Sequence, residues 1–82
     1  MKVGKSHLEA WVIEALEDLG GSARLVDVSR KIWERHEQDL RDSGELFFKW
    51  QYDVRWAANQ LRTSGTLKSV KASKRGLWEL DK

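Results

Sequence analysis

Polar side chains that can make hydrogen bonds recur along one stretch of this sequence, residues 50–65 (WQYDVRWAANQLRTSG). Their spacing of three or four residues places them on one side of an α-helix. They are Gln51, Arg55, Asn59 and Arg62, with Tyr52 beside them. Arg, Gln and Asn are the side chains that can make paired hydrogen bonds to base edges in the major groove of DNA. The chemistry that this pattern indicates is therefore recognition of nucleic acid.

The other side of the same stretch is apolar, which indicates how the helix is positioned. Trp50, Val54, Ala57 and Leu61 follow the helical repeat and predict a face buried against a core. Gly65 is suited to end the helix, because glycine adopts the left-handed conformation that follows a helix C-terminus. We therefore predict a helix over about 50–64 with a polar, partly cationic front. An ordinary amphipathic surface helix has the same pattern, so the rest of the chain must decide between the two interpretations.

Enzymatic and metal chemistry find little support in the residue types. The chain has no cysteine and two histidines, His7 and His36, neither of which has a partner at metal-ligand spacing. No nucleophile stands beside a base, and Gly20-Gly21 lacks both the lysine and the length of a phosphate-binding loop. We predict that the protein is not an enzyme and uses no metal or other cofactor.

Charge is distributed unevenly along the 82 residues, whose net charge is +2. Residues 1–48 hold 7 Lys and Arg against 10 Asp and Glu, a balance of −3, whereas residues 49–82 hold 8 against 3, a balance of +5. A basic half favours a polyanionic partner on one side of the molecule, although a solvated surface can show the same asymmetry by chance. No apolar run is long enough to span a membrane, and the N-terminus does not resemble a signal peptide. We expect a cytoplasmic bacterial protein with no membrane partner, nucleoid-associated if it binds DNA.

One small domain over residues 1–82 is expected to hold these elements. After a disordered end at residues 1–5, a first helix is predicted to open at Ser6, because Ser6 and Glu9 have the spacing of a capping box, and to end at Gly20-Gly21. A strand stub at 22–23 leads to a second helix over about 25–36, and a charged helical turn and loop follow over 37–45. The predicted buried stripe of the first helix is Leu8, Trp11, Val12, Ala15, Leu16 and Leu19.

The sequence period changes after Gly65, from the helical repeat to alternation. Residues 66–70 and 77–80 predict two strands, with Trp78 and Leu80 on one face of the second, and the polar segment 71–76 (KASKRG) predicts the turn between them. The result is a hairpin with a basic tip, which must pack on the helices because a two-stranded ribbon is marginal alone. Three helices with a C-terminal two-stranded wing make a mainly α fold with a small β-hairpin, the winged helix-turn-helix.

The residues of this fold also carry a family resemblance. Residues 54–57 (VRWA) with Leu61 and Gly65, then 75–80 (RGLWEL) and the earlier 15–23 (ALEDLGGSA), resemble the N-terminal winged-helix domain of Mrr-type restriction endonucleases. The resemblance implies a stand-alone module that docks on duplex DNA. It does not imply cleavage, since this sequence shows no acidic metal-binding cluster of the kind that a nuclease core needs.

We therefore predict a protein that binds double-stranded DNA, with a regulatory or DNA-docking role. The third helix is expected to enter the major groove, and the wing at 71–75 to lie on the phosphate backbone. With roughly five cations at work, log K is expected to fall with log salt at about −0.9 per phosphate neutralised. The predicted contact residues are Lys49, Gln51, Tyr52, Arg55, Asn59, Arg62, Lys68, Lys71, Lys74 and Arg75.

The alternative is a winged helix for protein–protein interaction or homodimerisation without DNA binding. The aromatic segment 46–52 (LFFKWQY), Ile13 and the acidic first half of the chain favour it. Either Phe47 or Phe48 is expected to fill the core while the other is exposed. Trp56 either packs under the wing or lies exposed, and the family resemblance favours packing.

Overall fold

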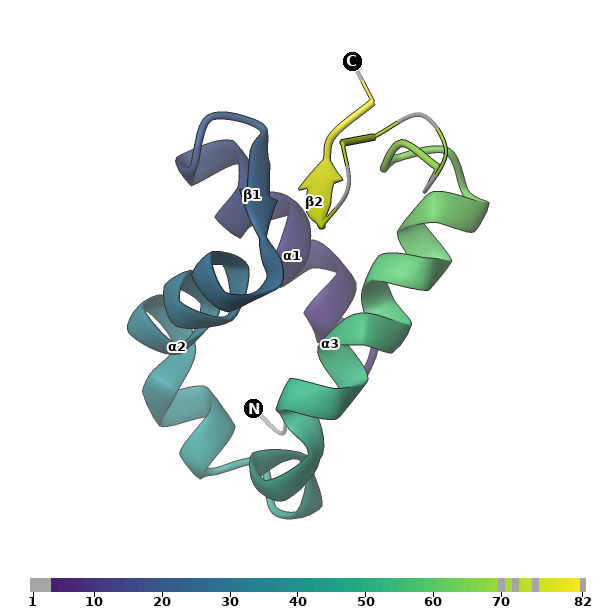
Figure 1. Ribbon diagram of the computed structural model, residues 1–82. Helices are drawn as coiled ribbons and strands as arrows, with labels where there is room; N and C mark the ends of the chain where they lie inside the picture. The colour runs from purple at the N-terminus through teal and green to yellow at the C-terminus, as the bar shows by residue number, and fades with distance from the viewer. Residues whose placement is uncertain (1–3, 70, 72, 75, 82) are drawn as a thin grey trace.

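The computed structural model describes residues 4–69, 71, 73, 74 and 76–81. Within these residues, three helices and two short strands follow one another as α1 (His7–Asp18), β1 (Ser22–Arg24), α2 (Leu25–Arg41), α3 (Glu45–Thr63) and β2 (Leu77–Glu79). Figure 1 shows the helices gathered together, with the two strands side by side at one end. The predicted fold class, a mainly helical winged helix-turn-helix with a small β wing, is confirmed.

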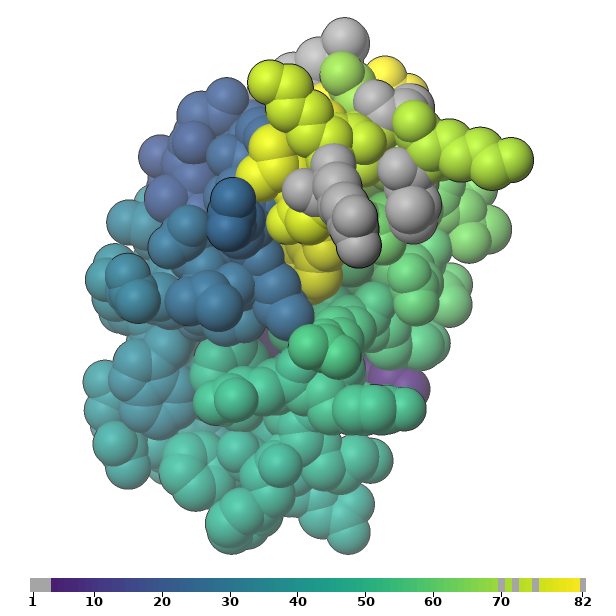
Figure 2. Space-filling view, viewed as in Figure 1, coloured from purple at the N-terminus to yellow at the C-terminus, as the bar shows by residue number. Residues whose placement is uncertain are grey.

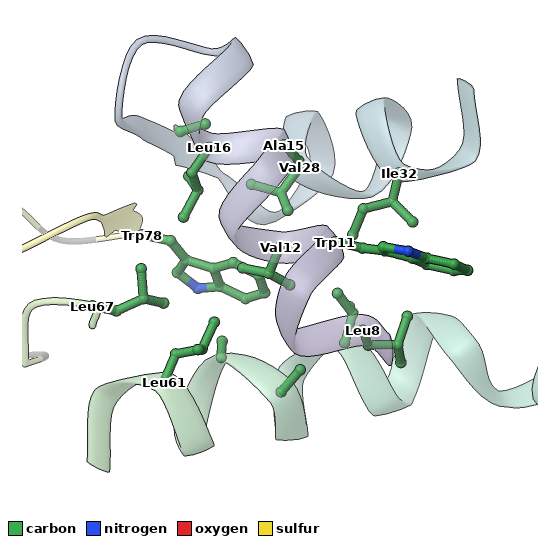
Figure 3. Close-up of a cluster of buried hydrophobic side chains, with 14 of the residues drawn as sticks. Leu8, Trp11, Val12, Ala15, Leu16, Val28, Ile32, Leu61, Leu67 and Trp78 are labelled. Carbon is green, nitrogen blue, oxygen red and sulfur yellow. The ribbon is translucent and has the colours of Figure 1, made fainter. Parts of the chain in front are cut away.

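The hydrophobic core is built around α1, which packs against both α2 and α3. Its buried residues recur every three or four positions, as predicted, and are Leu8, Trp11, Val12, Ala15 and Leu16, with Leu19 partly buried. Figure 3 shows this stripe gathered with Val28 and Ile32 of α2, Leu61 of α3 and Trp78 of β2. Burial of this shared apolar area is the main stabilising contribution in a domain of this size.

The start of α1 differs from the predicted capping box. Ser6 has φ −65° and ψ −23°, already a helical conformation, and its side chain makes no capping hydrogen bond. The backbone satisfies the first amides instead, since His7 N–H donates to Gly4 O at 3.0 Å and Leu8 N–H to Lys5 O at 3.1 Å. Of the end predicted to be disordered, Gly4 and Lys5 thus form a turn that leads into α1, and residues 1–3 lie outside the described residues.

α2 runs beyond its predicted end and bends at His36. His36 has φ −128° and ψ 22°, so the predicted end of the helix coincides with a kink, and part of the predicted helical turn becomes the last section of α2. The His36 ring stacks on Trp11 with centroids 3.9 Å apart, and its Nε2 lies 2.7 Å from Glu14 Oε1. The helix continues past the kink because Leu40 is fully buried there.

Arg35 joins α2 to α1 on the surface beside this kink. Its Nε donates a hydrogen bond to Asp18 Oδ2 at 2.6 Å, and its Nη1 lies 3.4 Å from Glu14 Oε2. The hydrogen bond to Asp18, followed by the charges of Asp18 and Glu14, raises the pKa of Arg35 above its ordinary value. Because the pair is exposed to water, its strength is expected to fall with salt concentration.

α3 begins at Glu45 rather than at residue 50, and Gly44 separates it from α2 with a φ of +70°. The prediction placed the start too late because Phe47 and Phe48 are apolar but lie off the buried stripe, which obscures the helical repeat. Leu46 lies one turn before Trp50 and shares its buried face. That face consists of Leu46, Trp50, Asp53, Val54, Ala57, Ala58 and Leu61. The helix ends at Thr63, just before Gly65 with its φ of +85°, as predicted.

The strand pairing differs from the predicted hairpin. β2 pairs along its length with β1, in an antiparallel register that sets Ala23 opposite Trp78. The segment predicted as the first strand of the hairpin, 66–70, contributes one isolated bridge, Leu67 to Leu80, and Val70 lies outside the described residues. The strand stub predicted at 22–23 is present as β1, but its pairing with β2 was not predicted, because the partner lies near the other end of the chain.

The wing is nevertheless fixed on both sides of β2. Lys68 N–H donates to Glu79 O and Asp81 N–H donates to Thr66 O, each at 2.9 Å, so β2 lies between β1 and the segment that follows α3. Trp78 is buried on the inner face of this strand, as predicted. Through these contacts the wing is held beside the C-terminal end of α3.

Candidate nucleic-acid interface

The outer face of α3 presents the side chains that the sequence singled out. Gln51, Tyr52, Arg55 and Asn59 are exposed, and Arg62 is half-buried, all on the side opposite the buried stripe. Figure 2 shows α2 in blue to teal, α3 in green and the wing in yellow-green meeting on one face of the molecule. The core therefore positions α3 as predicted, with its polar front outward.

Cations of α2 are neutralised by neighbouring carboxylates. The shortest distances are 2.6 Å from Arg35 Nε to Asp18 Oδ2 and 2.8 Å from Arg41 Nε to Glu37 Oε2. Lys31 Nζ lies 3.4 Å from a Glu34 oxygen, and Arg30 Nη1 lies 3.9 Å from an oxygen of Asp27. Although α2 is rich in Lys and Arg, these pairs leave it with little free positive charge.

The described cations of α3 and the wing have no such partners. Among the residues that the structure describes, no carboxylate forms an ion pair with Lys49, Arg55, Arg62, Lys68, Lys71 or Lys74. Few acids lie in residues 49–82. Asp53 is buried in the core, and Glu79 accepts hydrogen bonds from Ser22 Oγ and from Lys74 N–H. Unpaired cations on adjoining elements create a positive potential that attracts polyanions.

The structure brings most, but not all, of the predicted contact residues together. Lys71 and Lys74 are exposed on the wing, Lys68 is half-buried at its base, and Arg75 lies outside the described residues. Lys49 is exposed on the flank of α3, about 120° around the helix from Arg55. We therefore place Lys49 apart from the face that holds the other residues of α3.

A cavity of about 350 Å³ joins the C-terminal end of α3 to the wing. It is lined by Leu25, Arg62, Ser73, Lys74, Gly76, Leu77 and Trp78. The Nε of Arg62 is buried and has no hydrogen-bond acceptor among the described residues. Within the predicted contact set, the half-buried Arg62 thus differs from the exposed Arg55 in having a buried Nε.

Arg24 is a candidate that reasoning from the sequence missed. It is exposed, it has no ion pair within the described part of the chain, and the register of β1 with β2 sets it opposite Leu77. Leu77 lines the cavity just described, so Arg24 lies at the wing although it is far from it in sequence. No local signal could have found it, because the pairing of β1 with β2 is a long-range feature.

A second surface feature is aromatic and was only partly predicted. Phe48 is 85% exposed and Tyr52 is 77% exposed on α3, and Val26 of α2 is 64% exposed. Beside them an open groove of about 510 Å³ runs between α2 and α3, with Leu25, Val26, Ser29, Arg30, Trp33, Trp50 and Gln51 along it. Exposed apolar groups around a groove are typical of binding surfaces.

The structure shows which of the residues with undecided burial are buried and which are exposed. Phe47 is half-buried with its ring centroid 6.4 Å from that of Trp33, whereas Phe48 is exposed. Trp56 is half-buried against the core, and Lys5 Nζ lies 4.3 Å from its ring centroid. Ile13, which the sequence offered as a surface residue, is partly buried against the core.

Comparison of this chain with protein families, curated proteins and solved structures gives no match. In the described part of the chain, no helix is both long and apolar enough to cross a membrane. The arrangement of charge, aromatic surface and cavities on the winged helix is therefore the basis of the function proposed for this protein.

Proposed function

We propose that this protein binds double-stranded DNA as a non-enzymatic winged helix, and that it corresponds to the DNA-docking module of Mrr-type endonucleases that it resembles. The observation that carries the proposal is the contrast in ion pairing. Arg and Lys of α2 have carboxylate partners, whereas the cations of α3 and the wing have none among the described residues. Cations left unpaired on one face are available to neutralise phosphates.

α3 supplies the base-reading part of this mechanism. Gln51, Arg55 and Asn59 are exposed along its front, and their head groups match the hydrogen-bonding edges of guanine and adenine. In helix-turn-helix proteins, a later helix of this kind lies in the major groove. The wing supplies Lys71 and Lys74, which set affinity and register through the phosphate backbone. A role as a regulatory or docking protein in the bacterial cytoplasm or nucleoid follows from this proposal.

The test is fluorescence anisotropy of a labelled duplex over a series of salt concentrations. The variant Lys71→Gln/Lys74→Gln removes two wing cations that have no ion pair among the described residues, and the matched control Arg35→Gln/Arg41→Gln removes two cations of α2 that are ion-paired. We expect the slope of log K against log salt to become shallower by about 1.8 in the first variant, at about 0.9 per phosphate contact. The control is expected to keep the wild-type slope, because its charges already have partners.

Two outcomes would contradict the proposal. One is the absence of binding at low salt by a protein whose circular dichroism shows an intact fold. The other is an equal loss of slope in both double variants, because net charge alone would then explain the binding. Selection of a preferred site from random duplexes would follow a positive result and test base reading by α3.

Homodimerisation is the second candidate function, and the exposed aromatic surface favours it. Phe48 and Tyr52 protrude from α3 next to the groove that Trp33 and Trp50 line. In a two-fold dimer, the protruding rings of each copy would face the groove of the other, which is the self-complementary arrangement that such symmetry needs.

The area available limits the strength of such a dimer. At roughly 150–250 Å² for each aromatic side chain, Phe48 and Tyr52 supply about half of the ~800 Å² per partner of a standard interface. Sedimentation equilibrium of the wild type, Phe48→Ser and Arg55→Gln tests it. A dimer that dissociates only in Phe48→Ser would support this function, and a monomeric wild type at high concentration would remove it.

A further inference from the structure

We infer that the cavity between the C-terminal end of α3 and the wing is a binding site for a single phosphate group, which Arg62 and Lys74 hold. The inference rests on the proposed DNA binding and deepens it, because it divides the predicted contact residues by role. Arg62 shares the front of α3 with the base-reading candidates, yet here it positions the DNA backbone. Phosphate contacts set register without carrying sequence information.

The Arg62 guanidinium has a buried N–H group, the Nε–H, that lacks a hydrogen-bond acceptor among the described residues. A buried donor on a charged group without a partner costs free energy, since its hydration is lost and nothing replaces it. That cost is recovered in a complex in which an anion occupies the cavity beside the guanidinium. An arginine held for structural reasons alone would be expected to reach a carboxylate or a carbonyl oxygen.

The cavity is lined by cationic and apolar side chains. Among the described residues that line it, the charged ones are Arg62 from α3 and Lys74 from the wing, and none is a carboxylate. Leu25, Leu77 and Trp78 supply apolar walls. Apolar walls lower the local dielectric constant, which strengthens the attraction between the cations and an anion seated between them. Glu79, the acid of β2, is already engaged by the N–H of Lys74 at 3.1 Å.

The cavity lies between the proposed recognition helix and the wing. Arg62 lies at the end of the proposed recognition helix, and Lys74 lies on the wing. An anion between them would therefore contact both elements. The volume of about 350 Å³ is ample for a phosphate group, given that a water molecule occupies about 30 Å³. A phosphate of the DNA backbone held there would fix the rotation of α3 in the groove.

Nuclear magnetic resonance of the arginine side chains gives a direct test. The Nε–H signal of Arg62 is expected to be visible because burial protects it from exchange with water, and its absence from the spectrum of Arg62→Lys assigns it. Titration with duplex DNA, and separately with sodium pyrophosphate, is expected to shift this signal saturably. Sodium chloride at matched ionic strength is expected to leave it unmoved. An Arg62 signal that none of these additions moves would overturn the inference.

Binding measurements separate the role of Arg62 from that of Arg55. Arg62→Gln is expected to make the salt slope shallower by about 0.9 and to weaken binding to two unrelated duplexes by the same factor. Lys74→Gln is expected to act similarly, and the double variant to lose less than the two single variants together, because both residues hold one phosphate. Arg55→Gln is the matched control on the same helix, and it is expected to change the ratio of affinities for the two duplexes.

The failures of the two proposals are distinguishable. If the wild type binds duplex DNA with a salt-dependent affinity but Arg62→Gln leaves the slope unchanged, the proposal of a phosphate-binding site is wrong and the proposal of DNA binding stands. If pyrophosphate shifts the Arg62 signal but duplex DNA neither binds nor shifts it, the site binds a free phosphate compound and the proposal of DNA binding is wrong.

Discussion

Replacing Trp78 with alanine is expected to destabilise the whole domain, because this side chain joins the wing to the helices. Trp78 comes from β2 and is 8% exposed. Figure 3 shows its indole among Val12 of α1, Leu61 of α3 and Leu67 at the base of the wing. Removal of the indole leaves a cavity at the point where these elements meet. The helices and the wing are therefore expected to lose stability together.

The magnitude follows from the area that the indole buries. At roughly 200 Å² and about 25 cal/mol per Å², the contribution is about 5 kcal/mol, and replacement of a buried aromatic side chain by alanine typically costs about 3–5 kcal/mol. A domain of 82 residues is expected to be stable by about 4–12 kcal/mol, at roughly 0.05–0.15 kcal/mol per residue. The variant therefore loses a large share of its unfolding free energy.

Urea unfolding followed by far-UV circular dichroism measures this loss without relying on tryptophan fluorescence, which the substitution itself changes. Trp33→Ala is the matched control, because Trp33 is also an indole but is only partly buried, between α2 and α3. We expect it to cost clearly less than Trp78→Ala. A loss below about 1 kcal/mol for Trp78→Ala, or a loss no larger than that of the control, would refute the reasoning that the wing is held through this contact.

Three smaller predictions concern the turns and the surface. Gly65→Ala is expected to lower the unfolding free energy by about 1–2 kcal/mol. Gly65 has a φ of +85° and a Cβ there meets no atom within 4 Å, so a loss far above that range in urea unfolding would point to a clash instead. Arg35→Gln is expected to lower the urea midpoint at low salt, with the difference closing near roughly 1 M salt; an equal difference at both concentrations would argue against the ion pair with Asp18. Phe48→Ala is expected to change the unfolding free energy by less than about 0.5 kcal/mol, because the ring is 85% exposed, and a larger loss by the same measurement would show that the ring packs in solution.

Helical periodicity was enough to predict the main buried stripe of α1 and of α3. Leu8, Val12 and Leu16 of α1 recur every four residues and form one side of the core. The same repeat from Trp50 to Leu61 places the buried face of α3 correctly. This works because the face of a helix that packs inward is set by residues only three or four positions apart, so the information is local.

Features that depend on distant partners were not predictable in this way. The kink at His36 accompanies its stacking on Trp11 of another helix, and β1 is a strand because Ala23 meets Trp78 near the end of the chain. The capping box at Ser6 was wrong for a local reason instead, since the backbone at Gly4 and Lys5 already satisfies the first amides of the helix. The kink and the strand pairing, by contrast, were decided by contacts between residues far apart in the sequence.

The sequence by itself determined where the cations and the polar face of α3 lie along the chain, because composition and helical spacing are properties of neighbouring residues. Only the tertiary structure decided which of those cations are free. It pairs Arg35 and Arg41 of α2 with carboxylates, leaves Arg55 without one among the described residues, and places Arg62 and Lys74 around one cavity. The physical reason is that an ion pair or a shared cavity depends on distances in space between elements, which are set by the packing of the helices and the wing around a common core.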